Sequence, residues 1–345
     1  MMKTSISGNR RKKWRVLKFI TLLFCTALMV ISAGFLYEWY ASVKAKGDYP
    51  PSGKLVEAGG YQLHIHQQGS GSPTIILEAG SGETSLSWRD IPNELAKYAT
   101  VVTYDRAGYA WSESSPTERS GANIVKELHT ALEKEGIGGP YIMVGHSLGG
   151  MYARLFAQTY RNDVEGLVLI DARPEDDERN TKDLLKQAHF QGNPPASLLS
   201  VLKLSGSFRL FPDFMLEGLV AKQDRDAFVN VIATPSFFHA KEEEAALAYK
   251  TEDAIRGQNL ESIPVRIIAR GLPQNYAQAG ISDDIGKELE SIWQAGQRNM
   301  LNISEDSELI VASKSGHMVI HDEPDLVIQT ILQLLSNNNK THSIR

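Results

Sequence analysis

The sequence has few residues that cross-link a chain or bind metals. Its 345 residues include one cysteine, Cys25, which excludes an intramolecular disulfide and a metal site built on cysteines. A histidine pair, His64 and His66, has no cysteine or acidic neighbour, so we interpret it as the polar face of a strand. The net charge of -5 gives no reason to expect nucleic-acid binding, and no phosphate-binding glycine loop or internal repeat is present. We expect no metal and no cofactor.

Charge is missing altogether from one stretch near the N-terminus. Residues 19–37 contain no charged side chain, and residues 1–18 carry basic but no acidic ones. About 20 apolar residues cross a bilayer core, and basic flanks stay in the cytoplasm. We therefore expect residues 19–40 to anchor the chain in the cell membrane, with the N-terminus cytoplasmic and the remainder outside. The alternative is a cleaved signal peptide, whose apolar core is shorter, about 7–15 residues.

Composition then divides the chain into six parts. We predict a basic N-terminus at 1–18, a membrane segment at 19–40, a linker at 41–53, a core formed by 54–172 and 263–336, a helical cap at 173–262, and a disordered tail at 337–345. The linker is rich in proline and glycine. The cap interrupts a regular alternation of strands and helices, and we expect it to cover the active site and to select the substrate.

The core alternates between strand-like and helix-like stretches. Apolar runs without polar alternation occur at 73–78, 100–104, 141–145, 164–170, 264–269 and 308–312. Such runs are typical of strands buried on both faces, and the alternation predicts an α/β fold with a mostly parallel, doubly wound sheet. Sites in such sheets lie at the carboxyl ends of strands. The polar residues that follow these strands are Ser81, Asp105, Ser147 and Asp171.

Ser147 lies where a predicted strand turns into a predicted helix. It is the centre of a Gly-His-Ser-Leu-Gly motif, with Gly145 and Gly149 two residues to either side. A serine in this context forms a nucleophile elbow, a strained turn that admits only small neighbours and pushes the hydroxyl out of the sheet. The motif predicts that Ser147 is a nucleophile.

A serine nucleophile requires a base and a carboxylate that orients the base. His317 follows the last predicted strand and is the expected base, with His321 as its nearby alternative, while His146 is expected to face the sheet or a helix. For the acid we favour Asp171. The alternatives are Asp283 or Asp284, which begin a predicted helix, and the cap acids Glu175, Asp176 and Asp177.

The reaction also requires two N–H donors for the developing oxyanion. Leu148, the residue after the nucleophile, is expected to supply one of them. The loop after the strand at 73–78 is expected to supply the other, through Ser81, with Gly82 close behind.

Four segments carry a family resemblance. They are Ile-Leu-Glu-Ala-Gly-Ser-Gly at 76–82, Tyr-Asp-Arg-Ala-Gly-Tyr-Ala-Trp-Ser at 104–112, Val-Gly-His-Ser-Leu-Gly-Gly at 144–150 and Ser-Gly-His at 315–317. With them, residues 54–336 resemble the α/β-hydrolase family that includes esterases, proline iminopeptidases and C–C bond hydrolases. The sequence departs from the family pattern in two places. Ala79-Gly80 replaces the usual His-Gly, and no carboxylate directly follows the strand at 264–269.

The resemblance implies a serine hydrolase that forms an acyl-enzyme on a small-molecule acyl substrate, with an ester as the expected bond. An aminopeptidase or amidase is the first alternative. A non-catalytic scaffold that binds a small molecule or a protein is the second. Serine as the nucleophile, in place of aspartate, argues against the haloalkane dehalogenase branch.

Overall fold

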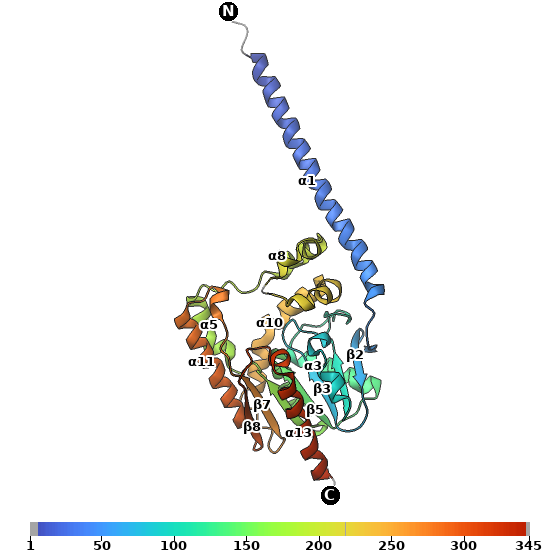
Figure 1. Cartoon of the computed structure of the whole chain (residues 1–345), viewed down its shortest axis with the longest axis vertical. Helices are drawn as coiled ribbons and strands as arrows, with labels where there is room; N and C mark the ends of the chain where they lie inside the picture. The colour runs from blue at the N-terminus through green and yellow to red at the C-terminus, as the bar shows by residue number, and fades with distance from the viewer. Residues whose placement is uncertain (1–5, 218, 343–345) are drawn as a thin grey trace, which may run out of the picture. The chain divides into compact units, whose positions relative to one another are not determined.

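The computed structural model describes residues 6–217 and 219–342, and Figure 1 shows their course. Internal contacts divide the chain into two units. The first, which we call the anchor–cap unit, comprises Met1–Pro50 and Ala196–Pro235. The second, the core unit, comprises Pro51–Pro195 and Ser236–Arg345.

The core unit is built on one eight-stranded sheet. Its strands are β1 (Lys54–Glu57), β2 (Gln62–Gln68), β3 (Thr74–Glu78), β4 (Thr100–Tyr104), β5 (Tyr141–His146), β6 (Val164–Ile170), β7 (Val265–Arg270) and β8 (Ser307–Ala312). Their order across the sheet is β1-β2-β4-β3-β5-β6-β7-β8. The β1–β2 and β2–β4 pairs are antiparallel and all other pairs are parallel. The predicted, mostly parallel sheet is confirmed.

Helices cover both faces of this sheet (Figure 1). The longer helices of the core unit are α3 (Gly121–Glu135), α4 (Leu148–Thr159), α5 (Asp177–Gln187), α10 (Pro235–Ile255), α11 (Asp283–Asn299) and α13 (Pro324–His342). The short ones are α2 (Ile91–Leu95) and α12 (Val319–Asp322). Within β3, Ile76 joins the hydrophobic cluster under α3 and α4, while Ile75 and Leu77 join the cluster under α2 and α13. Successive side chains of a strand point to opposite faces, so the strand must be apolar throughout.

The hairpin at the start of the sheet differs from expectation in one respect. Gly59 and Gly60 form its turn, both with positive φ (111° and 102°), which glycine adopts without strain. His64 was expected on the polar face of its strand, but it is fully buried. Its Nδ1 lies 2.8 Å from Asp105 Oδ2, and its Nε2 accepts a hydrogen bond from the Gly53 N–H at 3.0 Å. The buried carboxylate explains how a strand histidine can face inward.

Three helical boundaries also differ from the sequence prediction. The pattern at 86–98 predicts one helix, but only Ile91–Leu95 is α-helical, because Pro92 is tolerated in a first turn and not in a helix interior. Helix α1 (Ile6–Asp48) continues through most of the predicted linker and ends just before Pro50 and Pro51. Helix α13 likewise runs to His342, where the sequence indicated an irregular tail, and residues 343–345 lie outside the described part.

The anchor–cap unit combines α1 with a group of short helices. These are α6 (Ala196–Leu204), α7 (Ser207–Leu210), α8 (Pro212–Leu216) and α9 (Arg225–Ala227). Glu38 of α1 binds this group, since it pairs with Lys203 and also accepts a hydrogen bond from Arg209 Nε at 2.8 Å. Helix α1 is the one helix in the described part of the chain that is long and apolar enough to cross a membrane, and its apolar stretch is not buried.

Candidate active site

The site is organised by the turn at Ser147, between β5 and α4. Ser147 has φ 53° and ψ -122°, a conformation that is uncommon for a residue with a side chain. A Cβ on Gly145 would lie 2.5 Å from the Gly149 carbonyl oxygen, and a Cβ on Gly149 would lie 2.4 Å from the Glu78 carbonyl oxygen. Only glycine fits at either position, as the motif predicts. The strained backbone is held on both sides of the serine, since its N–H donates to the Ile170 carbonyl at 3.0 Å and its carbonyl accepts the Gly150 N–H at 3.0 Å.

His317 lies against this serine. It follows β8, and its Nε2 is 2.9 Å from Ser147 Oγ, while its Nδ1 is 2.6 Å from Asp171 Oδ2. With Nδ1 donating to the carboxylate, Nε2 is the acceptor that faces the hydroxyl. The His317 side chain is 30% exposed and Ser147 is half-buried, so both residues are partly open to solvent.

Asp171 is the carboxylate that contacts His317. It follows β6 with φ 39° and is fully buried. Arg270 Nη1 donates to it at 2.8 Å and Trp293 Nε1 at 2.9 Å. Burial would raise the pKa of the Asp171 carboxyl, but the hydrogen bond to His317 and the charge of Arg270 outweigh burial and lower the pKa to about 2. The group is therefore ionised at neutral pH.

The other candidate acids lie elsewhere. Asp283 and Asp284 lie in the first turn of α11. The residue of this helix that contacts Asp171 is Trp293, not an acid. The three acids expected in the cap lie in the core unit and pair with arginines instead, namely Glu175 with Arg154, Asp176 with Arg256 and Asp177 with Arg173. The alternative base, His321, has its Nε2 2.8 Å from the Ser87 carbonyl oxygen. Among the residues that the structure describes, Asp171 is the carboxylate that hydrogen-bonds His317.

His146 links two loops of the site. Its Nε2 is 2.9 Å from the His317 carbonyl oxygen, and its Nδ1 is 2.9 Å from the Glu83 carboxylate. With Glu83 ionised, both acceptors call for a proton on the ring nitrogen that faces them, so the imidazolium is the form of this fully buried side chain that satisfies both contacts. Burial would lower the pKa of His146, but the Glu83 charge overcomes that effect and raises it. The sequence prediction that His146 faces inward did not reveal this ion pair.

The loop that should supply the second oxyanion donor is fixed from two sides. Buried Arg106 donates to the carbonyl oxygens of Ala79 at 2.6 Å and Gly80 at 2.7 Å. Glu83 Oε2 accepts the Gly80 N–H at 2.8 Å, so that group is already engaged. Within residues 6–217 and 219–342, the N–H groups of Ser81 and Leu148 donate no hydrogen bond to another residue. The Gly82 N–H, the alternative to Ser81, likewise donates no hydrogen bond to another described residue, so both candidates in this loop are open to a ligand.

The described residues contain no group of three histidine, cysteine, aspartate or glutamate side chains arranged to hold a metal ion. Sequence reasoning missed Arg270, Trp293, Glu83 and Arg106. The signal for Arg106 was present, since it belongs to the 104–112 segment of the family resemblance, but nothing local indicated its target.

The fold and this arrangement define a class of protein. A mostly parallel eight-stranded sheet, a serine at a sharp strand-to-helix turn and a histidine after the last strand are typical of α/β hydrolases. The chain belongs to the alpha/beta hydrolase fold family, whose model matches residues 73–324.

Individual proteins and solved structures are also similar to this chain. The uncharacterized protein YbdG of Bacillus subtilis (strain 168) is 27% identical over 161 residues, which are 46% of this chain and 50% of that protein. The ligand-free epoxide hydrolase CorEH is similar with a TM-score of 0.61 and 21% identity, over 82% of this chain and 98% of that one. A thermophilic esterase from Thermogutta terrifontis is similar with a TM-score of 0.55 and 18% identity, over 82% and 96%. At such identities these two structures show a shared fold only.

Proposed function

We propose that this α/β hydrolase cleaves carboxylic esters through an acyl-enzyme on Ser147. The observation that carries the proposal is the continuous hydrogen-bonded line from Ser147 Oγ through His317 to Asp171, at 2.9 and 2.6 Å. His317 takes the hydroxyl proton as the serine oxygen attacks the acyl carbon, and then donates that proton to the departing alcohol. Water activated by the same imidazole releases the acid, while Asp171 stabilises the imidazolium.

The proposed reaction also needs N–H donors that stabilise the oxyanion. Negative charge develops on the acyl oxygen as the tetrahedral intermediate forms, and we assign its stabilisation to the N–H groups of Ser81 and Leu148, a choice supported by their lack of any other acceptor among the described residues. Leu148 is also the first residue of α4, so its N–H lies at the positive end of the helix dipole. Loss of one such donor costs about 3–4 kcal/mol in the barrier.

Structural neighbours include an epoxide hydrolase, and the identity of the nucleophile distinguishes the two reactions. Attack of a serine oxygen on an epoxide carbon forms an ether, which water does not cleave, so the enzyme would be consumed. Attack on an acyl carbon forms an ester, which water does cleave. Ser147 therefore favours acyl transfer over epoxide opening, whereas an aspartate in its place would have favoured the reverse.

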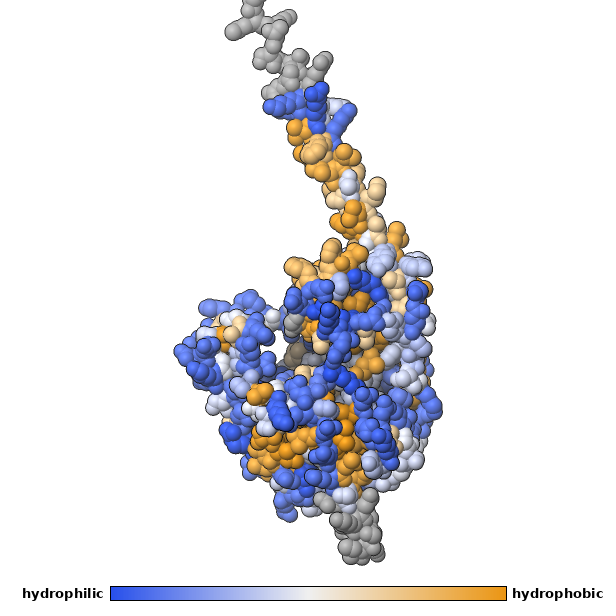
Figure 2. All heavy atoms as spheres, in the orientation of Figure 1, coloured by the Kyte–Doolittle hydropathy of each residue, from blue (hydrophilic) through white to orange (hydrophobic). Residues whose placement is uncertain are grey.

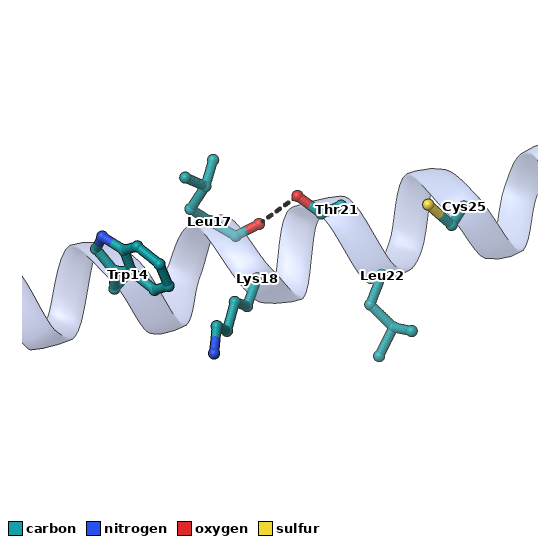
Figure 3. Close-up of a pocket in the computed structure, with 6 residues that line it drawn as sticks. All are labelled: Trp14, Leu17, Lys18, Thr21, Leu22 and Cys25. Atoms are coloured by element: carbon teal, nitrogen blue, oxygen red, sulfur yellow. Dashed lines mark hydrogen bonds between the residues drawn. The ribbon is translucent and has the colours of Figure 1, made fainter.

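Helix α1 supports a membrane location. We propose that residues 19–40 cross the cell membrane, with the N-terminus in the cytoplasm and the catalytic unit on the other side. Two hydroxyl groups of the apolar stretch are hydrogen-bonded within the helix: Thr21 Oγ1 donates to the Leu17 carbonyl at 2.9 Å (Figure 3), and Thr26 Oγ1 donates to the Leu22 carbonyl at the same distance. Self-satisfied polar groups are what a lipid environment demands.

A substrate panel tests the activity. Full-length protein in detergent is assayed with nitrophenyl esters of increasing acyl length and with aminoacyl anilides. We expect ester turnover that Ser147→Ala abolishes. Turnover of the anilides alone would favour the aminopeptidase alternative. A folded wild type that turns over neither but binds the compounds would favour a non-catalytic scaffold.

A further inference from the structure

The anchor–cap unit has an unusual distribution of polarity. In α6, Ser200 and Lys203 are buried, while Leu198, Val201 and Leu204 are 48%, 55% and 44% exposed. A helix on the surface of a water-soluble domain has the opposite arrangement. The exposed apolar side chains continue along the chain into α7, α8 and the residues after them. We call this set the cap face, and it consists of Leu198, Val201, Leu204, Leu210, Phe211, Phe214 and Leu219.

The interior of the same unit holds charges. Glu38 is 2% exposed and Lys203 is 5% exposed, and the two are paired. Lys203 Nζ also donates to the Val229 carbonyl at 2.8 Å, and Arg209 Nε donates to Glu38 Oε2 at 2.8 Å. Polar groups that are mutually satisfied inside and apolar groups outside are the arrangement of a surface that faces lipid.

The level at which the cap helices contact α1 indicates which lipid they would face, namely the bilayer that α1 would cross. A Cβ on Gly34 would lie 2.5 Å from the Ser205 carbonyl oxygen, so the two backbones are in direct contact there. Gly34 belongs to the charge-free run at 19–37. It lies about 22 Å along the helix from Phe19, at about 1.5 Å per residue, within a hydrocarbon core about 30 Å thick. The cap helices therefore contact α1 where it would leave the bilayer.

Figure 2 shows apolar side chains along α1 and on the surface beside its lower end, and Ser205, directly after α6, is in contact with α1 at Gly34. Phe214 of α8 is 85% exposed and Leu219 is 79% exposed, which is more than any apolar side chain of α1. The acid between Phe211 and Phe214, Asp213, is paired with Arg225 at 2.5 Å. Exposed apolar side chains gathered in this way mark a contact site, and their position in the same unit as α1 favours a bilayer as the contact.

We propose that the cap face inserts into the headgroup–acyl boundary of the bilayer that α1 crosses, so that α6, α7 and α8 form a membrane-seated platform. This inference rests on the proposed membrane anchor. The cap would then be a second, monotopic membrane contact, stabilised by burial of its leucine and phenylalanine side chains.

Site-specific fluorescence tests the proposal in the full-length chain. Because Cys25 is the only cysteine, Cys25→Ser provides a cysteine-free background. Single substitutions Phe214→Cys, Met29→Cys and Tyr98→Cys then carry one environment-sensitive fluorophore each, on the cap face, the anchor and the core unit. Met29 and Tyr98 are 72% and 63% exposed, so both positions accept a label. The proteins are reconstituted into vesicles of phosphatidylcholine and phosphatidylglycerol and quenched with acyl-chain nitroxides or aqueous iodide.

We expect the Met29 and Phe214 probes to be quenched by the nitroxide lipid and shielded from iodide, and the Tyr98 probe to behave in the opposite way. A Phe214 probe that behaves like the Tyr98 probe, while Met29 is in lipid, would overturn the inference and leave the anchor intact. A Phe214 probe shielded from both quenchers would mean that protein covers the cap face, as in a second copy, and would also overturn it. If Met29 is not in lipid, the anchor and the inference fail together. Labelling of Ser147 by a fluorophosphonate in the same vesicles reports on the hydrolase function separately.

Discussion

Trp293 donates its indole N–H to the carboxylate of Asp171 across 2.9 Å, and its ring lies edge-on to His317, with ring centroids 5.7 Å apart. One side chain thus contacts both partners of the pair that would activate Ser147. Arg270 stacks on the same ring, 4.8 Å from its centre, while it pairs with Asp171. The Asp171 carboxylate is thus held by Trp293 of α11, Arg270 of β7 and His317 in the loop after β8, and its loss should be costly.

Asp171→Asn is expected to lower kcat at least ~100-fold, because an amide does not hold His317 in the tautomer that accepts the serine proton. Steady-state kinetics on the best ester checks this. Asp284→Asn, at the start of α11, is the matched control and should retain wild-type activity. A small effect at Asp171 with a large one at Asp283 or Asp284 would transfer the role of the acid to α11.

Trp293→Phe should lower kcat by about 3–10-fold with KM unchanged. The substitution keeps the ring against His317 but removes one hydrogen bond to a charged acceptor, a bond worth about 1.5–3 kcal/mol net. Because Arg270 still binds Asp171, we expect only about 0.7–1.4 kcal/mol of this to appear in the barrier. Trp39→Phe, at an exposed position on α1, is the control and should change neither constant. A rise in KM alone would show that Trp293 contacts substrate and does not position Asp171.

The Glu83–His146 pair predicts a pH-dependent stability. The pKa of His146 is raised, so its contribution is present below the unfolded value of about 6.5 and is lost as pH rises through the folded value. The pKa of Glu83 is lowered, because the His146 charge and the Gly80 N–H outweigh burial, so its contribution is lost as pH falls below about 4.5. The pair is therefore most stabilising between these two values.

Glu83→Gln should accordingly lower Tm most at about pH 6 and less at about pH 9, with a loss of about 2 kcal/mol at the lower pH, since the substitution removes a charge-assisted hydrogen bond. Thermal unfolding in detergent measures this. Glu94→Gln, whose carboxylate pairs with Lys97 at the surface, should show no such pH trend. An equal loss at both pH values would mean that His146 is neutral.

Substitution by alanine should destabilise the protein at one glycine of the site and leave it almost unchanged at another. Gly149→Ala places a methyl group 2.4 Å from a backbone carbonyl oxygen that cannot move away, so we expect a loss of about 1–3 kcal/mol and a fall in kcat. Gly316→Ala meets nothing within 4 Å and should change stability by less than about 0.5 kcal/mol. Urea unfolding compares the two. A Gly316 variant as damaged as the Gly149 variant would contradict this account of the elbow.

Much of the fold was predictable because its signals are local. Buried strands such as Thr100–Tyr104 are continuous apolar runs in the sequence. The sharp turn at Ser147 is indicated by the two glycines that flank it. The length of α1 was less predictable. Its last turns are polar but contain helix-compatible residues, and the helix ends only before Pro50 and Pro51.

The supports of the site were not predictable in this way. Arg270 and Trp293 lie 99 and 122 residues from the aspartate that they bind, and neither has a sequence signature for that role. Glu38 and Lys203, 165 residues apart, resemble solvent-exposed charges in sequence and are buried together in the structure. Such pairings depend on tertiary contacts, which periodicity and composition do not encode.

Covalent labelling of the full-length, folded protein with a fluorophosphonate, followed by peptide mass spectrometry, tests most directly whether Ser147 is an activated nucleophile. We expect a single adduct on Ser147, absent from Ser147→Ala and formed much more slowly in His317→Ala. A folded wild type that remains unlabelled, or an adduct on a different serine, would contradict this expectation.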